Sequence, residues 1–102
     1  MKIIPMRSYG DFLTSREDGR QVYEAIKRDY LTSHPGIQFF CDFQGVKVLA
    51  PSFCDEVFGS WMEEFPNTLA LDQSMNHALK AAFETVEETR RVRFRFCAPG
   101  AV

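Results

Sequence analysis

Two segments of the chain alternate hydrophobic and polar positions, which is the period of a β-strand with one buried face. In segment 37–43 the apolar positions are Ile37, Phe39, Cys41 and Phe43. In segment 91–97 the apolar positions are Val92, Phe94 and Phe96, and the positions between them are Arg91, Arg93 and Arg95. Both segments are predicted to be strands, the second with a wet face. A shorter apolar run, 68–71, predicts another strand.

Three other stretches repeat apolar residues at the spacing of one helix face. The first begins at Ser15, with Asp18 in the reciprocal capping position, and turns Val22, Ala25, Ile26 and Tyr30 inward. The second starts around Pro51 and Ser52, stops before Pro66, and turns Val57, Phe58, Trp61 and Met62 inward. The third is expected to be capped by Asp72 or Ser74. Its inward positions are Met75, Ala78, Leu79, Ala82, Phe83 and Val86.

The order of these elements is strand, helix, strand, helix, strand, helix, strand. This order favours strands that run in parallel and are joined by right-handed helical crossovers. Because two strands alternate instead of being apolar throughout, the helices are expected to cover one face of the sheet. The predicted fold is a small two-layer α/β sandwich, with a mixed, largely parallel sheet of about four strands and three helices mainly on one face. Residues 1–102 are predicted to form one domain.

Composition narrows the range of functions. The 102 residues are 45% hydrophobic and carry a formal net charge of −2, so there is no general attraction to nucleic acid or to an anionic membrane. No apolar run approaches the ~20 residues that a membrane-spanning helix needs. Three cysteines, Cys41, Cys54 and Cys97, lack the spacing of a zinc site or of a disulfide framework. We therefore expect a cytoplasmic protein with reduced thiols, no metal and no cofactor.

The run from Cys41 to Gly59 carries a resemblance. Its Asp-Phe-x-Gly-Val segment starts at Asp42, and its Pro-Ser-Phe-x-Asp-Glu segment starts at Pro51. Together with the helix entry Ser15-Arg16-Glu17-Asp18-Gly19, these residues resemble the STAS-like domains, which are named for sulfate transporters and anti-sigma-factor antagonists. The likeness extends over roughly residues 12 to 90. It implies a small bacterial β/α domain that regulates by binding, since better-known relatives bind a histidine-kinase-type ATPase and are switched by phosphorylation.

The resemblance also indicates where a partner would bind. In the anti-sigma-factor antagonists an Asp-Ser pair at the start of the helix is the switch, and here that pair falls on Ala50-Pro51, with Ser52 one step later. Ser52 is therefore either a phosphorylation switch or a capping hydroxyl aided by Asp55. A partner protein is expected on the loop and helix of residues 44–60. The expected contact residues are Gln44, Gly45, Lys47, Ser52, Asp55 and Glu56.

Two rival functions stay open. A small enzyme could use Cys54 or Ser52 as its nucleophile with His77 as base, although the acidic neighbours of Cys54 oppose a thiolate. Alternatively, Arg91, Arg93 and Arg95 could stack on one strand face and bind phosphate, an acidic surface or, less expectedly, nucleic acid. The same arginines could instead protect an edge strand from pairing with other chains. Self-association of the domain also stays possible.

Overall fold

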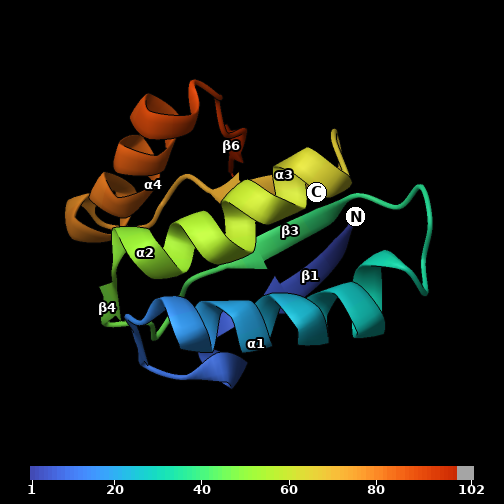
Figure 1. The fold of residues 1–102 in the computed structure, drawn as a ribbon, viewed down its shortest axis with the longest axis horizontal. Helices are drawn as coiled ribbons and strands as arrows, with labels where there is room; N and C mark the ends of the chain where they lie inside the picture. The colour runs from blue at the N-terminus through green and yellow to red at the C-terminus, as the bar shows by residue number, and fades with distance from the viewer. Residues whose placement is uncertain (99–102) are drawn as a thin grey trace.

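Residues 1–98 are described in a computed structural model of the chain, which has two layers (Figure 1). The main sheet holds β1 (Lys2–Pro5), β3 (Phe39–Asp42), β5 (Leu69–Asp72) and β6 (Phe96–Cys97), in the order β1-β3-β5-β6. Every neighbouring pair in it is parallel. A second, smaller sheet pairs β2 (Phe12–Leu13) with β4 (Val48–Leu49), also in parallel.

The helical segments of the described chain form three rods. The first is α1 (Arg16–Ile26), which continues into a wider turn, η2 (Lys27–Leu31). The second consists of α2 (Pro51–Cys54), the wider turn η3 (Asp55–Gly59) and α3 (Ser60–Glu64) in unbroken succession. The third is α4 (His77–Arg90). A short 3₁₀ turn, η1 (Met6–Tyr9), leads from β1 to β2.

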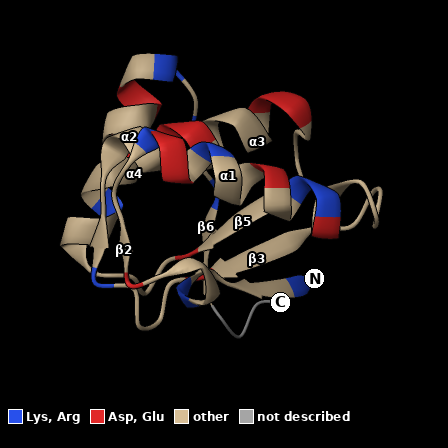
Figure 2. Ribbon diagram, turned by 60° about the horizontal axis from the view of Figure 1, so that its bottom comes forward, with Lys and Arg blue, Asp and Glu red and all other residues tan. Residues whose placement is uncertain are grey.

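All three rods lie on the same face of the main sheet (Figures 1 and 2). The cause is topological, because each successive strand is added on the same side of the previous one. Right-handed crossovers that always step in one direction place every connecting helix on one face. The predicted α/β architecture, a largely parallel four-stranded sheet with three helices on one face, is therefore confirmed.

Aromatic rings fill the space between the sheet and the helices. Phe58 and Trp61 from the second rod and Phe83 from α4 are fully buried. Phe83 lies at its centre, with its ring centroid 5.1 Å from that of Phe58 and 5.2 Å from that of Phe94. The apolar stripes expected on the second and third helices are thus mostly the ones that build the core, although Met62 is only half-buried and Ala78 is exposed.

The first helix begins as predicted. Ser15 is its N-cap, and the Ser15 hydroxyl accepts a hydrogen bond from the Asp18 amide at 3.0 Å. One turn later Gly19 lets α1 approach the second rod closely. A Cβ at this position would lie 3.0 Å from the Cβ of Glu56 and 3.1 Å from the Phe53 carbonyl oxygen. The contact between these two rods therefore depends on the absence of a side chain at position 19.

Two local predictions were wrong. Asn76 caps α4, its side chain accepting from the Leu79 amide at 2.9 Å, whereas Asp72 ends β5 and accepts from the amide and hydroxyl of Ser74. The strand expected over 91–97 is only Phe96–Cys97. Arg91 ends α4 in the left-handed conformation, with φ 56°, so the chain is still turning where the alternation suggested a strand.

The structure holds no helix, within residues 1–98, that combines the length and the apolar character needed to cross a membrane.

Candidate functional site

The small sheet of β2 and β4 brings the first loop of the chain beside the predicted partner loop. Phe12 is aligned with Val48, and Leu13 with Leu49. The Asp11 carbonyl accepts from the Lys47 amide at 2.8 Å, and the Leu13 carbonyl accepts from the Ala50 amide at 2.9 Å. These bonds fix segment 46–50, which follows the carboxyl end of β3, against a segment more than thirty positions earlier.

The loop that precedes β4 is a tight turn. The Gln44 amide donates to the Asp42 carboxylate at 3.0 Å, and the Val46 amide donates to the Phe43 carbonyl at 3.0 Å. Gly45 has a φ of +86°, and a Cβ there would lie 2.6 Å from Cδ of Arg7. Only glycine fits both the backbone angle and this close approach without strain. Phe43 and Val46 turn into the core, and the three residues expected to contact a partner here, Gln44, Gly45 and Lys47, are exposed.

The two faces of the small sheet differ little in polarity but greatly in exposure. Leu13 and Leu49 point inward and are buried. Their neighbours Phe12 and Val48 point outward and are 61% and 41% exposed. Beside Phe12 lies a groove of about 330 Å³, lined in part by Tyr9, Val22 and Phe53. An exposed aromatic ring next to a second exposed apolar side chain and a groove is typical of a protein contact surface.

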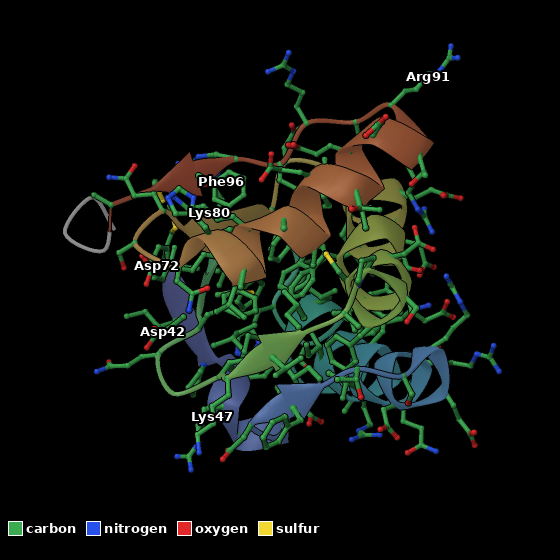
Figure 3. All side chains as sticks on the ribbon, turned by 90° about the vertical axis from the view of Figure 1, so that its left-hand side faces the viewer. Asp42, Lys47, Asp72, Lys80, Arg91 and Phe96 are labelled. Carbon is green, nitrogen blue, oxygen red and sulfur yellow. The ribbon has the colours of Figure 1, made fainter. Side chains whose placement is uncertain are left out.

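We call the exposed set Phe12, Gln44, Gly45, Lys47 and Val48 the ribbon surface. Its charge is mixed. Arg7 binds Asp11 with Nε 2.6 Å from Oδ1, and the Lys47 ammonium lies 4.0 Å from the other oxygen of the same carboxylate. Lys47 extends away from the body of the molecule (Figure 3). The apolar pair is thus bordered by charged groups of both signs, as is usual at the rim of an interface.

Ser52 stands close to this surface but is not the helix cap. Ala50 occupies the N-cap position and Pro51 begins α2, so Ser52 is the second helical residue. The Ser52 hydroxyl donates to the carbonyl oxygen of Thr14 at 3.1 Å, which ties α2 to the residue after β2. Ser52 also lines a groove of about 450 Å³ between α2 and α4, together with Arg16, Thr85, Thr89 and Arg90.

Asp55 and Glu56, which were predicted to contact a partner, bind arginines of the neighbouring helices. Arg16 of α1 donates to Asp55 at 3.0 Å and to Glu56 at 2.8 Å, and Arg90 of α4 donates to Asp55 at 2.5 Å. The basic residue Arg16 of α1 thus lies against the acidic start of η3 in the second rod, and coloured segments of both signs lie side by side there (Figure 2). The hydrogen bond from Arg90, joined by that from Arg16, lowers the pKa of the Asp55 carboxyl. The structure therefore separates this pair from the ribbon surface and gives it a role between helices.

The geometry around Cys54 does not favour a nucleophile. Cys54 is fully buried, and this burial raises the pKa of its thiol, an effect that Asp55 reinforces. Cys41 is also fully buried, and its pKa is raised by the same cause. His77, the proposed base, makes no side-chain hydrogen bond to Ser52 or Cys54 in the described structure. Across residues 1–98 no group of three or more His, Cys, Asp or Glu side chains is placed to hold a metal ion.

The three arginines of the expected ladder do not form one row. Arg91 belongs to the end of α4 and extends away from the molecule (Figure 3). Arg93 and Arg95 lie in the extended segment before β6, where the Arg95 carbonyl accepts from the Leu71 amide at 2.8 Å. Their side chains line a common pocket with Gln38 and Asn67. The predicted face is therefore reduced to a pair.

Sequence reasoning missed Phe12 and Val48. Phe12 follows Gly10-Asp11 in a segment too short to show a period. Alternation in the run 46–49 would place Val48 on the same face as Val46, whereas Val46 is buried and Val48 is exposed. The useful signal was the pair of adjacent apolar residues Phe12-Leu13 between polar neighbours, since only one of two adjacent strand residues can face the core.

Comparison with known proteins identifies the family. Residues 18–78, more than half of the 102, match the family model described as a STAS-like domain of unknown function (DUF4325). No curated protein and no solved structure matches the chain. The matched range contains most of α1, the partner loop, the second rod and β5, and it includes the run from Cys41 to Gly59 that carried the resemblance in the sequence. The chain belongs to the STAS-like domain family of unknown function.

Proposed function

We propose that this chain is a non-enzymatic regulatory module that binds a partner protein through the ribbon surface. One observation carries the proposal: Phe12 and Val48 stand side by side on paired strands and are exposed, although each has a buried neighbour on the same strand. Large exposed aromatic side chains are enriched where proteins bind each other, because burying them on association gains ~25 cal/mol for each Å² removed from water.

The partner that best fits the family likeness is a histidine-kinase-type ATPase. The ribbon surface follows the carboxyl end of β3 and leads directly into α2, the region in which the resemblance to anti-sigma-factor antagonists resides. We therefore narrow the partner contact that the sequence predicted over residues 44–60. Gln44, Gly45 and Lys47 stay in it, whereas Asp55 and Glu56 are occupied by Arg16.

Ser52 supplies the regulatory element of this proposal. A phosphate on Ser52 would carry a charge of roughly −1.5 to −2 and would remove the hydroxyl donor that binds the Thr14 carbonyl. It would also compete with Asp55 for the guanidinium of Arg16, which lines the same groove. Because Thr14 directly follows β2, a change at Ser52 reaches the strand that carries Phe12.

The first experiment places a photoreactive phenylalanine analogue at position 12 and, in a second variant, at position 3. Ile3 is a matched control, since it is 54% exposed and lies on β1, outside the ribbon surface. We expect a specific cross-linked protein from position 12 and not from position 3, and we expect mass spectrometry to identify it as an ATPase. The binding of the purified partner is then measured by calorimetry for wild type, Phe12→Ser and Ile3→Ser.

Phe12→Ser should weaken binding at least ~10-fold, which corresponds to about 1.4 kcal/mol, and Ile3→Ser should leave it unchanged. Equal affinity of all three proteins would contradict the ribbon surface as the contact. Identification of an unrelated partner that binds through Phe12 would retain the surface and overturn the ATPase assignment.

Ser52 is tested with the same purified partner. Ser52→Asp should weaken association by ~1–3 kcal/mol, roughly 5- to 150-fold, because it adds a carboxylate next to the ribbon surface. Ser52→Ala should lower the free energy of unfolding by about 1 kcal/mol, through the lost hydrogen bond, and leave affinity close to wild type. Identical affinities for the Ala and Asp variants would reduce Ser52 to a structural residue.

The enzyme alternative is not favoured, because a buried thiol with a raised pKa has little thiolate at neutral pH.

A further inference from the structure

A third pocket lies at the opposite end of the main sheet from the ribbon surface. It has a volume of about 210 Å³ and is lined by residues that include Gln38, Met62, Phe65, Asn67, Arg93 and Arg95. We call it the arginine pocket. Gln38 precedes β3 and Asn67 precedes β5, so the pocket is at the amino ends of these parallel strands. The ribbon surface, in contrast, follows the carboxyl end of β3.

Positive charge in this pocket is not neutralised by the protein. Five arginines of the described chain, Arg7, Arg16, Arg20, Arg28 and Arg90, form ion pairs with carboxylates. Within residues 1–98, Arg93 and Arg95 form none. The protein has a net charge of −2, so two adjacent unpaired guanidiniums are a local departure from its overall charge.

The polar groups of the pocket are held in a short chain of hydrogen bonds. Arg95 donates from Nη1 to the side-chain oxygen of Gln38 at 3.3 Å, and the Gln38 amide nitrogen donates to the Asn67 carbonyl at 3.3 Å. These bonds hold the Arg95 guanidinium beside the pocket while leaving most of its five donors for a ligand. Arg93, two residues earlier, lines the same pocket and supplies a second guanidinium.

The remaining lining is apolar. Met62 and Phe65 are half-buried, pack against the hydrophobic core and line the pocket from the second rod and the residue after it. Thr68 stabilises this corner, because its hydroxyl accepts from the Trp61 indole at 2.9 Å and donates to the Phe65 carbonyl at 2.7 Å. A bare inorganic anion would leave the apolar lining in contact with water. A ligand with an apolar body and an anionic head would contact both halves.

The volume of the arginine pocket limits the size of the ligand that it can hold. Pockets for drug-sized ligands and cofactors span ~300–1,000 Å³, and the arginine pocket is smaller. It has room for one anionic group and a short apolar chain, not for a nucleotide. A guanidinium binds a planar carboxylate through two parallel hydrogen bonds, and a second guanidinium nearby adds to the attraction, which matches a ligand with a single carboxylate.

We propose that the arginine pocket binds a carboxylate attached to a short apolar body. Two sources share this chemistry: a free short-chain organic acid, and the carboxyl terminus of a peptide that ends in an apolar residue. Arg93 and Arg95 bind the carboxylate, Gln38 orients Arg95, and Met62 and Phe65 contact the apolar body. The site is independent of the partner contact proposed above, since it shares no residue with the ribbon surface.

The test is an NMR titration of the full chain with hexanoate, followed through the backbone amides of Gln38 and Asn67 and the Nε–H of Arg95. Hexanoate should give saturable shifts at these signals. The dissociation constant should rise ~10-fold or more in Arg93→Gln and in Arg95→Gln, since each variant loses hydrogen bonds to a charged group. Arg91→Gln is the matched control, because Arg91 is exposed and lies outside the pocket, and it should bind as wild type does.

Three further probes sharpen the assignment. Hexanol, which has the same chain without the charge, should not bind, and inorganic phosphate should bind more weakly than hexanoate. A short peptide ending in leucine should bind with a free carboxyl terminus and not when amidated if the source is a protein. If hexanoate binds and the peptide does not, the source is a free acid.

Absence of saturable shifts with both hexanoate and the peptide would overturn the proposal. Equal affinities in wild type and in both pocket variants would also overturn it. Tighter binding of phosphate than of hexanoate would remove the carboxylate assignment, and loss of binding in Arg91→Gln would show a diffuse charge effect instead of a pocket. None of these outcomes depends on Phe12, so failure here is distinct from failure of the partner proposal.

Discussion

Phe58 and Phe12 show how differently the same side chain is used in two regions of this protein. Phe58 is fully buried between Phe43, Trp61 and Phe83, and its ring centroid lies 5.7 Å from that of Phe43. Phe12 stands on the outer face of the small sheet, 61% exposed. Of the ten phenylalanines, Phe12 is the one with a largely exposed side chain. Burial of the first builds the fold, and exposure of the second leaves apolar area for a partner.

The difference comes from what covers each strand. The main sheet is covered on one face by three helical rods, so residues such as Cys41 and Leu71 are completely buried. The small sheet has only two strands, and its outer face has no helix above it among the described residues. An apolar side chain is therefore structural in one sheet and available for binding in the other. Substitutions in the two regions should separate stability from binding.

Phe58→Ala should have the largest effect. Removing a fully buried ring leaves a cavity and costs ~3–5 kcal/mol, a large part of the stability of a small domain. Urea unfolding followed by the fluorescence of Trp61 measures the change. Phe65→Ala, at a half-buried ring, should lose clearly less. An unchanged unfolding midpoint for Phe58→Ala would contradict its place in the core.

Gly19→Ala tests the close approach of α1 to the second rod. Alanine gains roughly 0.5–1 kcal/mol of helix propensity over glycine, but overpacking against Phe53 and Glu56 costs ~1–3 kcal/mol. We expect a net loss of about 1 kcal/mol in thermal unfolding. Glu24→Ala, at an exposed position of the same helix, should stay within ~0.5 kcal/mol of wild type. A more stable Gly19→Ala would mean that the helices separate at little cost.

A low pH should weaken the ion pairs through which Asp55 links the three rods. The pKa of Asp55 is lowered in the folded protein by Arg90 and Arg16, so its contribution is present above the unfolded pKa near 3.8 and is lost as the pH falls through the folded value. At pH 7, Asp55→Asn should be about 1 kcal/mol less stable than wild type. Urea titrations at decreasing pH should show this difference shrinking below pH ~4. A stability difference between wild type and Asp55→Asn that does not change with pH would show that it comes from packing and not from the charge of Asp55.

Phe12→Ser should have the smallest effect on the fold. Because the ring is mostly exposed, the free energy of unfolding should change by no more than about 0.5 kcal/mol. The hydrogen bonds between β2 and β4 come from the backbone and survive the change. Heat-induced unfolding measures the change in stability, and amide exchange at Lys47 and Ala50 measures whether the hydrogen bonds between β2 and β4 persist. Strong destabilisation would show that Phe12 is structural and would remove the basis of the ribbon surface.

The sequence predicted those parts of the fold in which periodicity and burial agree. The stripe Val57, Phe58 and Trp61 is buried as expected, and Ser15 caps the first helix because its hydroxyl is placed where free amides need an acceptor. The prediction of a strand over segment 91–97 was wrong for a physical reason. Alternation continues through this segment, but a strand also needs a paired neighbour, and within the segment only Phe96 and Cys97 are in register with β5.

The candidate site was predicted less completely, because exposure and pairing depend on distant segments. Gln44 and Lys47, expected as partner contacts, are exposed, so their position is compatible with that prediction. The role of Asp55 could not be read from its neighbours, since Arg16 and Arg90 reach it from other helices. Phe12 and Val48 are aligned because two strands of only two residues each are paired. No local sequence pattern predicts the pairing of two such short strands.

The unequal burial of the three cysteine thiols leaves one of them accessible for chemical labelling. Cys41 and Cys54 are fully enclosed, and burial raises the pKa of both. Cys97 is only half-buried and sits on β6, the last strand of the main sheet. A maleimide dye should therefore label the native, unmutated protein at this one position. Energy transfer between Trp61 and that dye would then follow the docking of the final strand in real time during refolding.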